Sequence, residues 1–187
     1  MQTKHFELGN GLEAKPASRS DAPSLIELVR RNIKPIGRYL PPLAEVITMD
    51  RAQAHFDLVE RQIAEGSLID WHLYQDGILC GGIRLNHIEA NNRKAAVGYF
   101  IDVRYQGRGL VSRALAQLLN HAFEDLRFNR VELRCHASNI PSQHVAARAG
   151  FVLEGRLREA CYSDNGFDDL FIFGLLASEH VSRDPKF

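Results

Sequence analysis

The sequence lacks the cysteine and histidine patterns that hold metals or disulfide frameworks. Its three cysteines, Cys80, Cys135 and Cys161, form no CxxC pair, and each lies in a stretch that we expect to be a strand. This arrangement favours small, buried side chains that stay reduced. The eight histidines include no HExxH spacing, so we expect no metal ligands among them.

The chain also lacks a net charge, because its 23 basic and 23 acidic residues cancel. No overall field then draws the chain to nucleic acid or to a membrane, and any anion site must be local. Residues 1–7 have no apolar segment typical of a signal peptide, and no uninterrupted apolar run approaches the length of a membrane span. We therefore expect a cytoplasmic protein without nucleic-acid or membrane partners.

The chain does contain enough apolar residues for one core, with 45% of its 187 residues apolar. We expect a single domain over residues 11–180, an N-terminal tail over 1–10 and a C-terminal tail over 181–187. Strand-forming residues between turn signals such as Asp76-Gly77 predict strands over 11–16, 71–74, 78–85, 95–101, 131–136, 151–160 and 169–176.

Capping residues and apolar periodicity predict four helices, beginning near residues 20, 48, 110 and 140. The prolines and glycine between Pro35 and Pro42 predict a loop with at most one short helix. The resulting order predicts a mixed α/β fold, with an antiparallel front half and a β-α-β-α-β back half.

The stretch from Tyr99 to Leu110 runs from an apolar strand, through a turn with two glycines, into an amphipathic helix. Glycines let the backbone approach a ligand closely, and the unpaired N–H groups of the first helical turn favour an anion. Several backbone donors converge on such an anion, and here they come from Gly107, Arg108, Gly109, Val111 and Ser112. The stretch therefore predicts a phosphate-binding turn.

Two familiar nucleotide-binding motifs fit this turn poorly. A Walker A loop needs a lysine and then serine or threonine after its last glycine, whereas Gly109 is followed by Leu-Val-Ser. A dinucleotide fingerprint needs a third glycine where Ser112 stands, and an acidic residue at the end of the next strand, which here ends in Cys135-His136. ATP-dependent or NAD-dependent chemistry is therefore disfavoured but stays open.

The spacing Gln106-x-x-Gly109-x-Val111 after a central strand, followed by a strand and an Asn-x-x-Ser helix, resembles the GCN5-related N-acetyltransferases (GNAT). The likeness is greatest to the RimJ/RimL branch, which acetylates protein N-termini. It is densest from about residue 93 to 175 and rests on segments 97–102, 105–110, 129–135, 139–142, 149–155 and 166–169. The resemblance implies a single-domain GNAT fold: a mixed, mostly antiparallel sheet of about seven strands, with a splayed central strand and flanking helices.

The resemblance further implies acetyl-CoA as cofactor. Its pantetheine arm would pair with the splayed end of the central strand, from Ile101 to Val103. Its pyrophosphate would bind the turn from Gln106 to Ser112, with Arg104, Arg108 and Arg113 adding local positive charge. Asn139 would contact the pantetheine or cap its own helix. Val111 departs from the family pattern, in which glycine or alanine is usual.

Catalytic roles follow from the same resemblance. Ser142 matches the serine thought to protonate the departing thiolate, although it could instead only cap its helix. The branch tends to place a glutamate where this chain has Cys161. Glu159 would share the face of Cys161 in a regular strand and could act as base through a water; an acyl-cysteine route through Cys161 is the less favoured alternative.

These features predict acetyl transfer to a primary amine by direct attack in a ternary complex. An α-amine has a pKa roughly 2.5 units below that of lysine, which lowers the cost of deprotonation by about 3.4 kcal/mol and suits a site with a weak base. A protein N-terminus, of the ribosomal-protein type, is therefore the expected acceptor. The alternatives are a small amine (polyamine, amino acid or aminoglycoside) and a non-catalytic acyl-CoA sensor. The family likeness also implies a homodimer.

Overall fold

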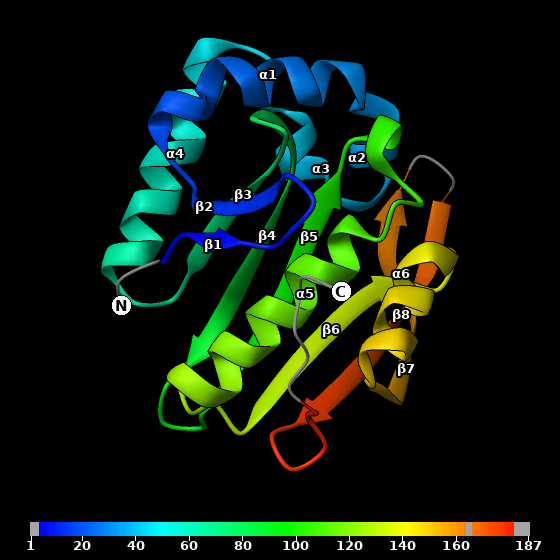
Figure 1. Cartoon of the computed structure of the whole chain (residues 1–187). Coiled ribbons are helices and arrows are strands. Elements are labelled where there is room, and N and C mark those ends of the chain that lie inside the picture. Colours follow the sequence, from blue (N-terminus) through cyan, green and yellow to red (C-terminus); the bar gives the residue numbers. More distant parts are fainter. Residues whose placement is uncertain (1–3, 164–165, 182–187) are drawn as a thin grey trace.

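The computed structural model describes residues 4–163 and 166–181. Within these residues eight strands form one sheet, in the order β1-β2-β3-β4-β5-β6-β8-β7 (Figure 1). Neighbouring strands are antiparallel except for the parallel pair β5 and β6. The strands are β1 (Phe6–Glu7), β2 (Leu12–Pro16), β3 (Ile69–Gln75), β4 (Ile78–Glu89), β5 (Lys94–Ile101), β6 (Arg130–His136), β7 (Val152–Ser163) and β8 (Gly166–Leu176).

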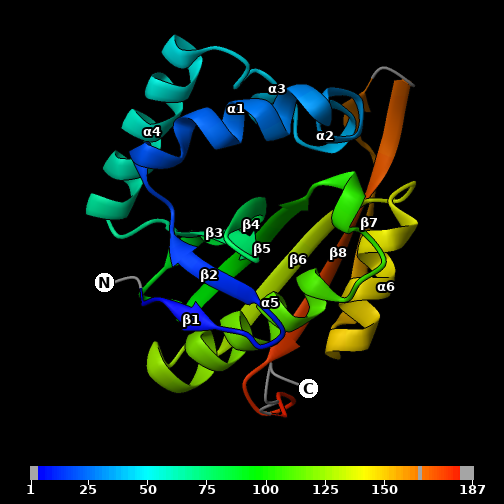
Figure 2. The ribbon, with the colours of Figure 1, turned by 45° about the horizontal axis from the view of Figure 1, so that its top comes forward.

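Helices cover both faces of this sheet (Figure 2). The first four lie over one face, which we call the front-half face: α1 (Ala22–Arg31), α2 (Ile33–Tyr39), α3 (Pro41–Ala44) and α4 (Met49–Ala64). Two lie over the opposite face, which we call the back-half face: α5 (Leu110–Asn120) and α6 (Ile140–Ala149). The mixed α/β order and the GNAT-like fold expected from the sequence are confirmed.

Two parts of the chain are more ordered than predicted. Phe6–Glu7 pairs with β2, and Leu8 is completely buried, so part of the predicted N-terminal tail belongs to the sheet. The expected loop after α1 forms both α2 and α3. A proline is compatible with the first helical turn, where its missing N–H has no intrahelical acceptor, and Ile36 and Leu43 bury their side chains against α1 and α4.

Polar caps begin α4 and α6, and a glycine ends α6. The Thr48 hydroxyl accepts the Arg51 N–H at 3.3 Å at the start of α4, and the Asn139 side-chain oxygen accepts the Ser142 N–H at 3.2 Å at the start of α6. Gly150 ends α6 with φ of +91°, a left-handed conformation that favours glycine. After α5 the chain continues as one π-helical turn, His121–Asp125.

The core is divided by the sheet into two clusters. The larger one packs α5 against the back-half face and includes Trp71, Leu115 and Val131. The smaller one packs α1 to α4 against the front-half face, where Phe100 of β5 contributes. Central strand β5 is therefore covered on both sides, as its apolar sequence predicts. In the described residues, no helix combines the length and apolar character needed to cross a membrane.

A buried carboxylate fixes the end of β5. The Asp102 side chain is fully buried and accepts hydrogen bonds from Arg31 of α1 at 3.0 Å and from Arg104 at 2.8 Å. Burial opposes its ionisation, but the hydrogen bonds from Arg104, Arg31 and Asn32 outweigh burial and lower the pKa of Asp102 to about 2. This ion-pair cluster ties α1 to the segment that leads into the predicted phosphate-binding turn.

Replacing this carboxylate tests its contribution to stability. Because folding lowers the pKa of Asp102, its stabilisation is complete above about pH 4 and is lost as the pH falls toward 2. We expect Asp102→Asn to reduce the free energy of unfolding at pH 7 by on the order of 2 kcal/mol. Urea titrations between pH 7 and pH 2.5 should show the difference from wild type shrinking below pH 4.

Glu27→Gln, an exposed carboxylate on α1, is the matched control and should change stability by less than about 0.5 kcal/mol. A difference between wild type and Asp102→Asn that stays constant down to pH 2.5 would mean that the carboxylate charge does not stabilise the fold.

Candidate active site

Strands β5 and β6 separate partway along their length. They pair from Lys94 with Arg130 to Val97 with Leu133 and no further. Beyond that point β4 holds β5 as far as Ile101, and β8 holds β6 as far as His136. The two strands therefore diverge into a wedge that opens toward the ends of both, which is the splay that the family resemblance predicted.

Backbone groups of β5 line one side of this wedge. The Asp102 N–H bonds to Cys80 of β4 at 2.8 Å, and strand residues alternate between their two neighbours. The N–H and C=O groups of Tyr99 and Ile101 therefore face the wedge. Val103 differs from the prediction, because its N–H donates to the Asn32 side chain at 2.9 Å and is not free for a ligand.

The predicted phosphate-binding turn has the expected backbone. Gly107 and Gly109 have φ of +74° and +73°, and neither has another atom within 4 Å of the position of a Cβ. Gly109 is the N-cap of α5, whose first intrahelical bond is donated by Arg113 at 3.0 Å. The preceding N–H groups of the first turn, including those of Val111 and Ser112, are therefore available to an anion.

The arginines around the turn differ in their partners. Arg104 is committed to Asp102, and Arg113 donates to the carbonyl of Gly9 at 3.0 Å. The guanidinium of Arg108 lies 5.2 Å from the centre of the Tyr105 ring and remains exposed beside the glycines. Local positive charge at the turn thus comes chiefly from Arg108.

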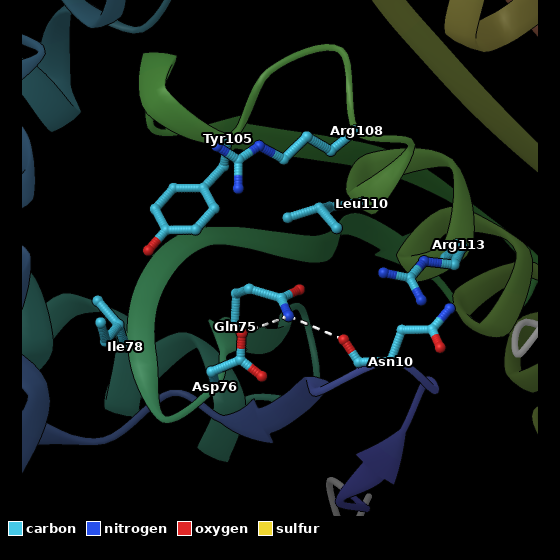
Figure 3. Close-up of a pocket in the computed structure, with 8 residues that line it drawn as sticks. All are labelled: Asn10, Gln75, Asp76, Ile78, Tyr105, Arg108, Leu110 and Arg113. Atoms are coloured by element: carbon cyan, nitrogen blue, oxygen red, sulfur yellow. Dashed lines mark hydrogen bonds between the residues drawn. The ribbon is translucent and has the colours of Figure 1, made fainter.

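Two cavities adjoin the turn. The larger, about 720 Å³, lies between the turn and the β3–β4 hairpin (Figure 3). Tyr105 and Arg108 form one wall of it, and Gln75 and Asp76 form the opposite wall. The smaller, about 210 Å³, lies between α5 and α6 and is lined in part by Ser112.

Ser142 lies at the wedge on the back-half face. It is 8% exposed, and its hydroxyl is 2.7 Å from the Tyr99 hydroxyl. Burial raises the pKa of Tyr99 to about 12, more than its hydrogen bond with Ser142 lowers it. Tyr99 therefore stays protonated, and it can donate to Ser142 Oγ. Burial also raises the pKa of the Cys135 thiol, which forms a hydrogen bond with Ser142.

A second polar group lies across the wedge on the front-half face. His136 of β6 has its Nδ1 3.5 Å from the Asp168 carboxylate of β8, and its ring lies edge-on to Tyr39 of α2, with centroids 5.2 Å apart. Cys161 is the β7 partner of Asp168 and shares its face. Sequence reasoning did not single out His136, Asp168 or Tyr99, although the alternation of β6, β8 and β5 assigns each to a face.

Glu159 does not share the face of Cys161 as a regular strand requires. The register of β7 shifts between Leu157 and Cys161, Glu159 has φ of +52°, and its side chain is exposed. Four residue steps on β7, from Leu157 to Cys161, oppose two on β8, from Leu170 to Asp168, so this bulge holds two extra residues. The alternation on which the prediction relied does not hold within it. The Glu159 N–H donates to Asp169 at 2.7 Å, which holds the bulge in place.

The three cysteines all lie in strands, as predicted, but only Cys80 and Cys135 are buried. Cys161 is half-buried, and burial together with the Asp168 charge raises the pKa of its thiol. A raised pKa keeps the thiol protonated at neutral pH and gives no support to an acyl-cysteine route.

Comparisons with known proteins agree with this geometry. A family model described as an acetyltransferase (GNAT) domain matches residues 12–152. YdaF of Bacillus subtilis (strain 168), provisionally named a ribosomal N-acetyltransferase, is 34% identical over 163 residues, covering 85% of this chain and 87% of that protein. The ribosomal-protein-serine acetyltransferase of Escherichia coli (strain K12) is 29% identical over 175 residues, covering 91% and 96%.

A solved relative has the same architecture. RimL, a ribosomal alpha-N-protein acetyltransferase in complex with coenzyme A as a cysteine disulfide, superposes with a TM-score of 0.88 at 25% identity, over 92% of this chain and 98% of that one. Family model, sequence relatives and fold agree with the prediction from sequence. The chain is an acetyltransferase of the GNAT family and belongs to its RimJ/RimL-like branch.

Proposed function

We propose that this protein transfers the acetyl group of acetyl-CoA to the N-terminal α-amine of a protein, by direct attack within a ternary complex. The observation that carries the proposal is the wedge between β5 and β6, with the Ser142 hydroxyl buried at its side. A ribosomal protein is the acceptor class that the relatives' names favour.

Both the pantetheine arm and the pyrophosphate of acetyl-CoA have candidate binding groups among the described residues. Free backbone groups of Tyr99 and Ile101 would pair with the amides of the pantetheine arm, as an added strand does. The turn formed by Gln106, Gly107, Arg108 and Gly109, with the N–H groups of Val111 and Ser112, would hold the pyrophosphate. Asn139 is committed to capping α6, so its predicted contact with the donor would use its remaining amide group.

Ser142 would act at the thioester end of the donor. Acetyl-CoA supplies an activated acyl group whose transfer leaves a thiolate that needs a proton. With the Tyr99 hydroxyl as the donor to Ser142 Oγ, the Ser142 hydrogen would be available to that sulfur. Glu159 receives no role as base, since its exposed side chain lies on the bulge.

An α-amine is the acceptor that such a site handles best. At neutral pH roughly a tenth of α-amino groups are neutral, against fewer than about one lysine in a thousand. Relatives that match a shorter part of this chain include the spermidine N(1)-acetyltransferase of Escherichia coli, at 29% identity over 101 residues. A polyamine is therefore the second candidate acceptor.

Substitution of Ser142 tests the assigned chemistry. We expect Ser142→Ala to lower kcat about 100-fold, the usual size of a general-acid contribution, with little change in KM for acetyl-CoA. The assay follows thiol release from acetyl-CoA with peptides bearing free N-termini, the same peptides with blocked N-termini, and spermidine. Ser24→Ala, at an exposed position of α1, is the control and should retain full activity.

The alternative functions predict different results in this assay or in a binding measurement. Transfer to spermidine but not to free N-termini would assign the protein to small amines. Tight binding of acetyl-CoA without transfer to any amine would identify a sensor. Calorimetry that detects ATP or NAD binding but no coenzyme A binding would exclude the donor altogether, and full activity of Ser142→Ala would exclude Ser142 as the acid.

The glycine turn gives an independent prediction about binding. Gly109 and Gly66 both have φ near +70° with open space around the Cβ position, but Gly66 follows α4, away from the wedge. Alanine at either position should cost about 1 kcal/mol of stability through backbone strain. Calorimetry should show weakened coenzyme A binding for Gly109→Ala alone; equal affinities for the two variants would count against the turn as the phosphate site.

A further inference from the structure

Direct acetyl transfer needs a proton acceptor on the amine side of the wedge. Ser142 and Tyr99 occupy the back-half face, together with α5 and α6. The amine must approach the carbonyl from the opposite face of the wedge, which α2 covers. The family's usual glutamate position is held by Cys161, and Glu159 is turned away by the bulge.

We propose that His136, oriented by Asp168, is the base that takes the proton from the attacking amine. The proposal rests on the function proposed above. His136 is the last residue of β6 and therefore stands at the mouth of the wedge. Its neighbour Cys135 contacts Ser142 on the back-half face, so strand alternation directs His136 to the front-half face. The ring contact with Tyr39 of α2 agrees with this direction.

The Asp168 carboxylate is positioned to favour one tautomer of the His136 imidazole. Its carboxylate accepts the Ser138 hydroxyl at 2.5 Å, the Ser138 N–H at 3.2 Å and the Asp169 N–H at 2.9 Å. The bonds from Ser138 and then Asp169 keep the pKa of Asp168 below its usual value, although burial opposes them. The carboxylate therefore stays charged and fixed beside the ring.

The buried Nδ1 of His136 has no hydrogen-bond partner in the part of the chain described, and Asp168 lies 3.5 Å from it. A carboxylate at this distance favours a proton on Nδ1, which leaves Nε2 as the lone-pair acceptor. Within the described residues, Tyr39 of α2 and Cys161 of β7 also face this site. His136 is the member of this group with a ring nitrogen that can accept a proton while its other nitrogen faces a carboxylate.

The proton balance of the step is complete. His136 Nε2 takes one proton from the amine as the N–C bond forms, and Ser142 gives one proton to the sulfur as the C–S bond breaks. The imidazolium then releases its proton to solvent, and Ser142 recovers one from solvent. The net change is amine plus thioester to amide plus thiol, with no oxidant or further reactant.

His136→Asn tests this assignment because the asparagine amide can replace Nδ1 as a donor to Asp168 while Nε2 is removed. We expect kcat/KM for the peptide to fall about 100-fold at pH 7, with unchanged affinity for acetyl-CoA. The deficit should narrow as the pH rises to 9, because more of the amine is then deprotonated in solution. His87→Asn, at an exposed position of β4 with φ of +48°, is the matched control and should behave as wild type.

A merely structural role of His136 would lower activity by the same factor at every pH, and that result, or full activity of His136→Asn, would overturn the proposal. Added imidazole should restore part of the activity of His136→Ala only if a base is missing. If the wild-type protein transfers acetyl to no amine, the proposed function itself is refuted. The midpoint of thermal unfolding of each variant shows whether that variant has folded.

Discussion

The site depends on the end of pairing between β5 and β6 after Val97 and Leu133. Each strand remains bonded to its outer neighbour, β4 or β8, so the divergence is imposed by the rest of the sheet. Unpaired backbone groups inside a fold need a partner, and those of Tyr99 and Ile101 can find one in an extended ligand. The same divergence separates Ser142 on one face from His136 on the other.

The two ends of the wedge are held by different polar interactions. At the β5 end, the buried Asp102 carboxylate binds Arg31 and Arg104 and so fixes the segment that enters the glycine turn. At the β6 end, Ser138 holds Asp168 beside His136. Both carboxylates have lowered pKa values because several donors converge on them.

Local sequence patterns predicted the strands, the cap at Asn139 and the glycine turn, because these depend on neighbouring residues. The second helix between Ile33 and Ala44 was missed, since tertiary burial overrides the helix-breaking tendency of prolines in that segment. The bulge at Glu159 and the pair of His136 with Asp168 arise from the register of β7 and β8, which a single sequence does not specify. The glycine turn proposed to bind acetyl-CoA could therefore be predicted from the sequence. The side chains on the amine side of the wedge could not.

The central claim is that the donor pairs with the free edge of β5, and amide hydrogen exchange tests it residue by residue. With saturating coenzyme A, exchange at the N–H groups of Tyr99 and Ile101 should slow, whereas that of Ala96, already paired with β4, should change little. Unchanged exchange at Tyr99 and Ile101, with protection appearing only elsewhere in the chain, would contradict the account.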